Sequence, residues 1–447
     1  MFKLSLISIH RNQQISKKSH SQNLVQRLES YNSCPQILDL GKASLKKHLL
    51  DGLSVNVVLL ANEYPPFIFG GIGTFMKELA QGLYRMGANV TIISGYPASW
   101  SGKEPRCENE DGIAVYRLPY PNIPPRHTSF QLANLKRVSQ IIEEVHPSII
   151  HGQSGSTFPL LSRLKRNAPV VVTFHSSPQM EKVTSIQSVL RGGTLTDFLT
   201  YVVGYPAWSI TLRKELEGSD SAITVSEALK HELLGEMGEK YNEKMHAIHN
   251  GVNVEMLDRE YNETKEIATE SEETILFAGR LFWRKGPLNM IKMACLLQRE
   301  KSRFRIIIHG SGPLSKKIQT CIRSLGLKNV EFKGFTTRSQ LMKSMRLAKF
   351  IAIPSIYEAC PMTLLEGMCL GKIPLMLNLP FASELTESGK YGLIANDMHS
   401  LTTKLVEASN NANLDHLSTK IRVFARQSYD INKTANKYLD IYNELCL

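Results

Sequence analysis

The stretch FIAIPSIYEACPMTLLEG, residues 350–367, reads as a buried strand, a loop and the start of a helix. Residues 350–355 are strand-like, and Pro361 suits the first turn of a helix, where no backbone N–H is needed. Ligands bind at the carboxyl ends of the strands in an open α/β sheet. We therefore expect Glu358 in the loop and Glu366 in the helix to lie at a binding site.

The first turn of this predicted helix is a second feature of a binding site. The N–H groups of Met362, Thr363 and Leu364 would have no partner within the helix, and the positive end of the helix dipole adds to them. Together they suit a phosphate group. Two glutamates at this spacing are more often solvated surface residues, so the interpretation depends on the rest of the chain.

A pair of basic residues follows another predicted strand. Residues 275–281 are typical of a buried strand, Arg280 lies at its end, and Lys285 follows before a glycine. Arg280 can bind a phosphate through two hydrogen bonds, whereas Lys285 provides a point charge. Residues 306–313, IIIHGSGP, predict a further strand that ends in a glycine-rich turn.

These motifs, in this order, resemble the C-terminal domain of the family 4 retaining glycosyltransferases of GT-B fold. That family carries a Gly-Arg…Lys-Gly pair, a strand ending in Gly-x-Gly-Pro, and two glutamates separated by seven residues. Residues 63–74, which include Gly70, Gly71 and Gly73, also resemble the first βα loop of the family. The resemblance covers roughly residues 54–440 and implies an α/β fold with two Rossmann-like domains facing across a cleft.

The resemblance also implies an activity: transfer of a sugar from a nucleotide-diphosphate sugar to a hydroxyl group of a glycan, lipid or small molecule. It assigns Glu358 and His175 to the catalytic centre near the donor sugar, and Glu366 to the ribose. It implies no cofactor beyond the donor substrate, and no Asp-x-Asp metal signature stands out, so no metal is expected. The donor-binding residues that we expect are Gly71, Gly73, Arg280, Lys285, Met362, Thr363, Leu364 and Glu366.

Two of these assignments have an ordinary structural alternative. His175 ends a predicted strand, and a lone histidine there is more often structural, although the family often has a histidine that contacts the donor sugar. His151, at the end of another predicted strand, is expected to be structural. The glycine loop lets the backbone approach a ligand closely, but its spacing is not G-x-G-x-x-G, which weakens a dinucleotide interpretation.

Strand-like and helix-like segments alternate from Val55 onward, which predicts doubly wound sheets. Residues 252–274 are polar and show no clear period, so we place the interdomain connection there. The predicted parts are a basic N-terminal extension (1–53), a Rossmann-like acceptor-side domain (54–252), a Rossmann-like nucleotide-sugar-binding domain (253–430) and a helix that crosses back to the first domain (431–447).

The length of 447 residues accommodates two domains with sizeable cores. Residues 1–50 contain eight Lys or Arg and two Asp or Glu, which is half of the net charge of +12. Such an arm either contacts an anionic membrane surface or remains a solvated extension. No apolar run approaches the ~20 residues of a membrane span, and the seven cysteines include no C-x-x-C pair. We expect a cytoplasmic protein, with peripheral contact at the inner membrane face left open.

Three alternatives remain open from the sequence. A nucleotide-sugar epimerase of similar build would turn over a UDP-sugar without an acceptor. A nucleic-acid-binding or scaffold protein would fit the pI of about 9.2, but no RNA-binding aromatic motif accompanies the charge, so no nucleic-acid partner is expected. A degenerate transferase is disfavoured because Arg280, Lys285, Glu358 and Glu366 are all present.

Overall fold

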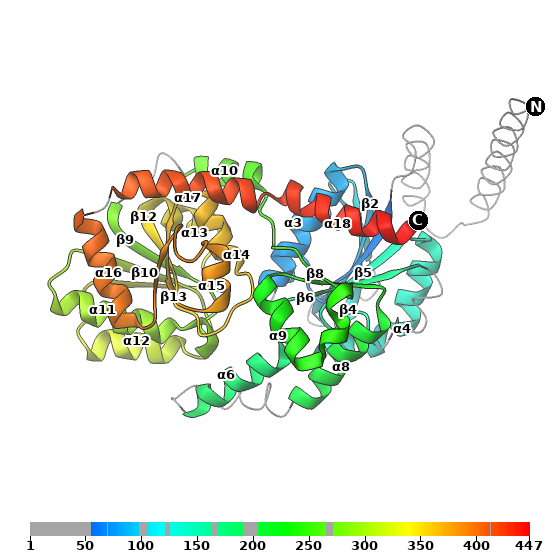
Figure 1. Ribbon diagram of the computed structural model, residues 1–447, viewed down its shortest axis with the longest axis horizontal. Helices are drawn as coiled ribbons and strands as arrows, with labels where there is room; N and C mark the ends of the chain where they lie inside the picture. The colour runs from blue at the N-terminus through cyan, green and yellow to red at the C-terminus, as the bar shows by residue number, and fades with distance from the viewer. Residues whose placement is uncertain are drawn as a thin grey trace, which may run out of the picture. The chain divides into compact units, whose positions relative to one another are not determined.

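The structure, a computed structural model, describes residues 55–68, 70–97, 106–120, 126–158, 160–161, 168–190, 204–264, 271–411 and 413–447. The predicted basic extension lies outside these residues, so its membrane role stays a prediction. Two β-sheets flanked by helices make up the described part of the chain (Figure 1). No helix among these residues is long and apolar enough to cross a bilayer.

The first sheet has eight strands in the order β3-β4-β2-β1-β5-β6-β7-β8, and all neighbours are parallel except β3 and β4. Its central strands are Val- and Ile-rich and fully buried, as expected when helices cover both faces. The strands are β1 (Asn56–Leu60), β2 (Asn89–Pro97), β3 (Arg106–Glu110), β4 (Ile113–Tyr120), β5 (Ile149–Gln153), β6 (Val170–Phe174), β7 (Ser221–Thr224) and β8 (Met245–Ala247). The helices are α3 (Gly71–Arg85), α4 (Arg126–Val145), α6 (Pro178–Leu190), α8 (Tyr205–Gly218), α9 (Glu227–Met237) and the 3₁₀ helix η2 (Glu239–Lys244).

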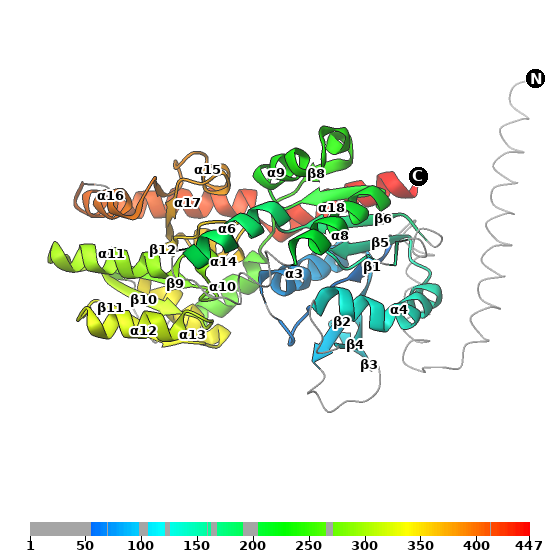
Figure 2. The same ribbon diagram turned by 90° about the horizontal axis from the view of Figure 1, so that it is seen from below.

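The second sheet has six parallel strands in the order β11-β10-β9-β12-β13-β14. Helices lie on both sides of it, with α17 and α12 on opposite sides of the strands in Figure 2. The strands are β9 (Ser271–Ala278), β10 (Arg305–His309), β11 (Val330–Gly334), β12 (Ala348–Ile353), β13 (Ile373–Leu377) and β14 (Leu393–Ala395). The helices are α10 (Val254–Asn262), η3 (Trp283–Lys285), α11 (Pro287–Arg299), α12 (Ser315–Ser324), α13 (Arg338–Leu347), α14 (Met362–Cys369), α15 (Pro380–Leu385), α16 (Met398–Asn411) and α17 (Leu414–Ser428).

The last helix, α18 (Ile431–Cys446), packs against the first sheet and against α3. Tyr438 and Tyr442 are fully buried there. Its start lies so close to α3 that a Cβ on Gly82 would be 3.1 Å from side-chain atoms of both Ile431 and Ala435. The predicted C-terminal helix is therefore part of the core around β5 and β6.

Two elements were not predicted from the sequence. Helix α10 lies within the segment that we expected to be an irregular connection; it is short and polar, and Leu257 is its one buried residue. The sequence of strand β3 is polar and lacks the alternation of apolar residues that would predict a strand. In the structure Glu108 and Glu110 bond to the buried Arg117 of β4, with O···N distances of 2.8 and 2.5 Å. Ion pairing across the strands, rather than apolar alternation, defines this edge.

Gly286 joins the loop after β9 to the loop after β12. It adopts φ +65°, and a Cβ at this position would lie 1.9 Å from the backbone oxygen of Pro354. The backbone N–H of Ile356 donates to the Arg284 carbonyl oxygen at 2.8 Å, and Asn289 Nδ2 donates to the Pro354 carbonyl oxygen at 3.0 Å. The two loops can approach each other this closely only because position 286 has no side chain.

We expect Gly286→Ala to reduce the free energy of unfolding by more than about 3 kcal/mol, because the backbone of residue 354 would have to move. Gly326→Ala is the matched control: Gly326 has φ +58°, and nothing lies within 4 Å of its Cβ position. That variant should lose only about 1–2 kcal/mol, from backbone strain. Urea unfolding of both variants measures the difference, and equal losses would contradict this account.

Candidate active site

Lys285 and Glu358 form an ion pair where the loops after β9 and β12 meet. Lys285 Nζ lies 2.5 Å from Glu358 Oε1, and the hydroxyl of Ser355 donates to the same oxygen at 2.9 Å. The Glu358 side chain is 9% exposed and that of Lys285 is 27% exposed. The structure therefore brings together a basic and an acidic residue that are 73 positions apart in the sequence.

Glu366 is buried in α14 and has a basic partner that the sequence analysis missed. Arg338, the first residue of α13, donates from a terminal guanidinium nitrogen to Glu366 Oε1 at 2.8 Å and from Nε to Glu260 Oε2 at 2.8 Å. No motif identified Arg338, because it lies 28 residues before Glu366 and on a different helix. Its guanidinium compensates the charge of the buried carboxylate in this structure.

The N-terminus of α14 is close to the glycine loop of the first sheet. Pro361 is the N-cap residue of α14, and the N–H of Leu364 bonds back to the Pro361 carbonyl oxygen at 3.0 Å. Within the described residues, no hydrogen bond is found for the N–H groups of Met362 and Thr363. A Cβ on Gly71 would lie 3.8 Å from Met362 Cγ. Two of the three predicted phosphate-binding N–H groups are thus available next to the glycine loop.

The glycine loop itself is held by Glu63. The carboxylate of Glu63 accepts hydrogen bonds from the N–H groups of Gly70 at 2.9 Å and Gly73 at 3.2 Å. It occupies the N-terminus of α3, where an anion is favourable. A side chain at position 73 would force Ile68 to move, because a Cβ there would lie 2.9 Å from Ile68 Cγ2. In this structure the N–H of Gly73 is engaged by the protein.

His175 directly follows β6 and is partly exposed. Its Nε2 lies 2.6 Å from Oε1 of Gln153, and its ring contacts Phe75 of α3 edge-on, with 5.6 Å between the ring centroids. Burial lowers the pKa of His175 to about 3. The imidazole is therefore neutral at physiological pH, so it acts through hydrogen bonds and carries no positive charge.

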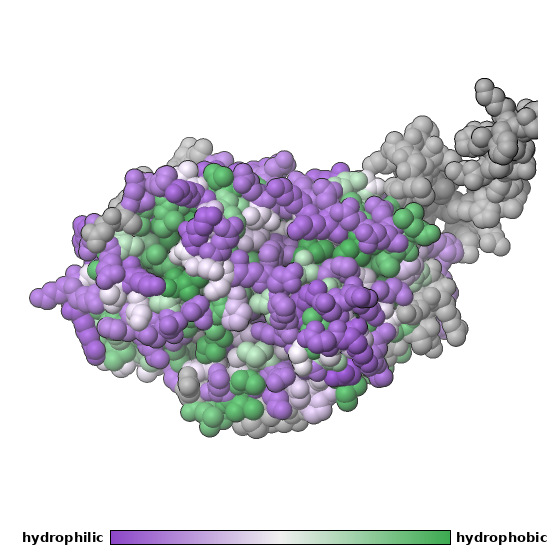
Figure 3. Space-filling model, viewed as in Figure 1, coloured by the Kyte–Doolittle hydropathy of each residue, from purple (hydrophilic) through white to green (hydrophobic). Residues whose placement is uncertain are grey.

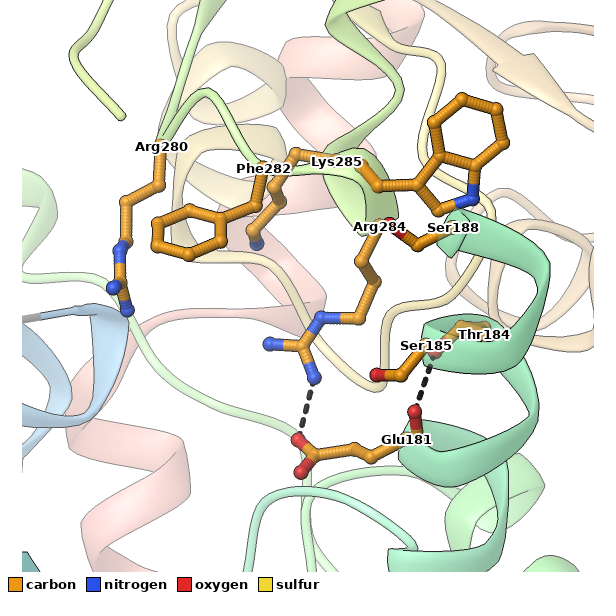
Figure 4. Close-up of a pocket in the computed structure, with 9 residues that line it drawn as sticks. Glu181, Thr184, Ser185, Ser188, Arg280, Phe282, Arg284 and Lys285 are labelled. Carbon is orange, nitrogen blue, oxygen red and sulfur yellow. Dashed lines mark hydrogen bonds and ion pairs between the residues drawn. The ribbon is translucent and has the colours of Figure 1, made fainter. Parts of the chain in front are cut away.

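Three basic residues surround a pocket between η3 and α6 (Figure 4). Arg284 donates to Glu181 Oε1 at 2.5 Å, whereas Arg280 is exposed and its guanidinium carbon lies 4.3 Å from the centroid of the Phe282 ring. The pocket is lined by Glu181, Thr184, Ser185, Ser188, Arg280, Phe282, Trp283, Arg284 and Lys285. Arg280 and Lys285 thus line one pocket, and their predicted role in donor binding stays a prediction.

Helix α6 presents its polar side to this pocket and its apolar side outward. Glu181, Thr184, Ser185 and Ser188 are buried, and the exposed hydrophobic residues of the helix are Val183, Ile186, Val189 and Leu190. Hydrophobic surface is visible along the lower edge of Figure 3, where α6 lies in Figure 1. The helix therefore has the reverse of the usual pattern, in which the apolar side is buried.

Two further side chains near these groups were not predicted. The hydroxyl of Tyr357 accepts from the Ser177 N–H and donates to Glu232 Oε2, both at 2.9 Å. Glu78 of α3 accepts from the Asn253 N–H at 3.0 Å, and burial together with the negative charge of Glu366 raises the pKa of Glu78 to about 7. Tyr357 adjoins the Glu358 motif, but nothing in the sequence marked Glu78.

The described residues contain no group of three or more His, Cys, Asp and Glu side chains that could hold a metal ion. The predicted metal independence stays a prediction.

Two Rossmann-like sheets, with basic residues, acids and a helix N-terminus near their strand ends, are the architecture that the resemblance to GT-B glycosyltransferases implied. The family description "Glycosyl transferases group 1" matches residues 258–422, and "Glycosyltransferase Family 4" matches residues 69–256. The chain belongs to this glycosyltransferase family, so the predicted fold class and enzyme class are confirmed.

The chain is similar to an uncharacterized glycosyltransferase of Methanocaldococcus jannaschii, with 27% identity over 71% of this chain and 79% of that protein. Its fold is similar to that of sucrose-phosphate synthase from Thermosynechococcus elongatus, with a TM-score of 0.72, 16% identity, and coverage of 88% of this chain and 99% of the other. The fold is also similar to that of HepE of Anabaena in complex with UDP and glucose, with a TM-score of 0.63 and 16% identity. The match covers 88% of this chain and 100% of the other.

Proposed function

We propose that this protein is a retaining glycosyltransferase that moves a sugar from a nucleotide-diphosphate sugar to a hydroxyl group of an acceptor. The observation that carries the proposal is the Lys285–Glu358 pair, which adjoins Arg280 and the N-terminus of α14. The complex of HepE with UDP and glucose supports this type of donor, because that protein shares the fold.

Arg280 and Lys285 would bind the donor diphosphate. Negative charge grows on the leaving diphosphate as the glycosidic bond breaks, so fixed positive charges stabilise the transition state more than the ground state. The N–H groups of Met362 and Thr363 would add two hydrogen bonds to the same group. When the donor binds, Lys285 would exchange Glu358 for a phosphate oxygen, which frees Glu358 to accept hydrogen bonds from the sugar.

Glu366 would accept hydrogen bonds from the ribose hydroxyls. Arg338 holds its carboxylate from one side at 2.8 Å, and a carboxylate has enough lone pairs to accept further donors. The role is orientation of the nucleotide, without a part in bond breaking. His175, neutral under working conditions, would contact a hydroxyl of the donor sugar.

Retention follows from a front-face path, in which the leaving phosphate helps to remove the proton from the acceptor hydroxyl. Glu358 would stabilise positive character on the sugar and would not form a covalent bond to it. The paired-acid logic of glycoside hydrolases therefore does not apply here. In this mechanism the side chains of Arg280 and Lys285 supply the positive charge at the diphosphate.

A screen of UDP-, GDP- and ADP-sugars by thermal shift identifies the donor, and the product of the best donor then tests the mechanism. We expect the product linkage to keep the anomeric configuration of the donor in NMR spectra, and we expect activity to survive EDTA. Inversion, or a complete loss with EDTA that manganese restores, would refute the mechanism. Turnover of the donor to an epimer without any acceptor would favour the epimerase alternative.

Replacing Arg280 or Lys285 with Ala should lower the turnover number about 100- to 10,000-fold, because each change removes one charge from a preorganised site. The fold should survive, since both side chains are partly or largely exposed. Lys292→Ala, at an exposed position on α11, is the control and should leave turnover unchanged. Near-normal rates in both site variants would remove these residues from the mechanism.

The two acids should behave differently when each is replaced with Gln. Glu366→Gln should weaken binding of the free nucleoside diphosphate, because the ribose contact does not need the sugar. Glu358→Gln should spare that binding and lower the rate of sugar transfer. Calorimetry with nucleotide and with nucleotide sugar separates the two effects, and equal losses of nucleotide affinity would show that the roles are assigned wrongly.

A further inference from the structure

A chain of four polar side chains connects His175 to the C-terminal helix. The hydroxyl of Tyr442 on α18 lies 2.6 Å from His151 Nδ1, and Gln153 Nε2 lies 3.3 Å from His151 Nε2. Gln153 Oε1 in turn lies 2.6 Å from His175 Nε2. His151, Gln153 and Tyr442 are buried, with exposed fractions of 2% or less. These groups therefore satisfy one another away from solvent.

The strands account for this arrangement. Strands β5 and β6 are parallel neighbours in which Gln153 pairs with Thr173, so the side chain of Gln153 lies next to the end of β6, where His175 follows. His151 precedes Gln153 by two residues and therefore shares its face of the sheet. Tyr442 and Tyr438 of α18 cover that face, with 5.8 and 5.5 Å between their ring centroids and that of His151.

The hydrogen bonds define a consistent set of proton positions. A carbonyl oxygen only accepts, so the contact with Gln153 Oε1 places the proton of neutral His175 on Nε2 and leaves Nδ1 with a lone pair. The amide of Gln153 then donates to His151 Nε2, and His151 Nδ1–H donates to Tyr442. The Thr173 hydroxyl lies 2.8 Å from the same nitrogen, so it shares the single lone pair of His151 Nε2 with the Gln153 amide.

The environment of His175 favours the neutral ring. Its hydrogen bonds and ring contacts in the described part of the chain involve Gln153, Ser154 and Phe75, none of which carries a charge. His151, reached through Gln153, is also kept neutral, because burial and then the neighbouring His175 lower its pKa to about 3. The orientation of the amide of Gln153 is therefore what selects the tautomer.

We propose that Gln153 is a positioning residue that holds His175 as the Nε2–H tautomer, so that Nδ1 can accept a hydrogen bond from a hydroxyl group of the donor sugar. Helix α18 fixes Gln153 in turn through Tyr442 and His151. The part of this proposal that concerns the sugar rests on the proposed function; the part that concerns the tautomer does not. The C-terminal helix thereby contributes to the catalytic centre without touching the substrate.

Gln153→Leu removes both amide hydrogen bonds at similar volume. We expect the turnover number of the full-length protein to fall about 10- to 100-fold, because a misplaced contact group costs rates of this order. Affinity for the free nucleoside diphosphate should be unchanged. The matched control is Gln131→Leu: Gln131 is 2% exposed, and its amide donates to Asn62 Oδ1 at 3.2 Å, outside the chain from Tyr442 to His175. Its turnover should stay near that of the wild type.

Gln153→Glu provides a readout that a merely structural role would not change. A carboxylate next to Nε2 stabilises the imidazolium and raises the pKa of His175. The protonated ring has no lone pair on Nδ1, so turnover should fall as the pH is lowered through the new pKa. The pKa of about 3 in the wild type places this loss below the working range. An unchanged pH profile in Gln153→Glu would overturn the proposal.

Nitrogen-15 NMR of histidine-labelled protein reads the tautomer directly, with the His175 signals assigned by their absence in His175→Ala. We expect the Nε2–H form in the wild type and a mixture of forms in Gln153→Leu. An Nδ1–H form in the wild type, or wild-type turnover in Gln153→Leu, would overturn the proposal. If the wild type shows the expected tautomer but transfers no sugar, the proposed function fails and the positioning by Gln153 stands.

Discussion

The site depends on the close contact between the loops that follow β9 and β12. Gly286 lies against the Pro354 carbonyl group, and the Ile356 N–H bonds to the Arg284 carbonyl oxygen at 2.8 Å. This backbone contact places Lys285 within 2.5 Å of Glu358. It also sets where α14 begins, and with it the N–H groups that suit a phosphate. A side chain at position 286 would separate all of these groups at once.

Polar contacts between side chains join the two sheets. Tyr357 bonds to Ser177 and Glu232, and Arg284 pairs with Glu181. Charged and hydrogen-bonded groups can exchange partners with a ligand at modest cost, whereas separating buried apolar surface costs free energy in proportion to its area. A transferase that must admit and release its substrates benefits from contacts of this kind.

Helix α18 shows how a distant part of the chain takes part in the site. It starts against α3, just after Asp430 forms a parallel bridge with Val252, and then covers β5 and β6 of the first sheet. Its tyrosines surround His151, which contacts Gln153, which contacts His175. We expected His151 to have a structural role. Its contacts are of that kind, and through Gln153 they hold the candidate catalytic residue His175 in place.

The sequence by itself determined the fold class, the buried parallel strands and the family, because such strands and short glycine-rich motifs are local patterns. The same patterns put Lys285, Glu358 and His175 in loops just after strands and Glu366 in the helix that follows one. Only the tertiary structure decided the partners of these residues: Arg338 beside Glu366, and Glu63 on the glycine loop. Helix α10 was missed for a related reason, since it has one buried residue. The Arg338 contact joins two helices, and the Glu63 contact depends on how the loop folds back onto the start of α3. Local spacing does not encode where these side chains come to rest.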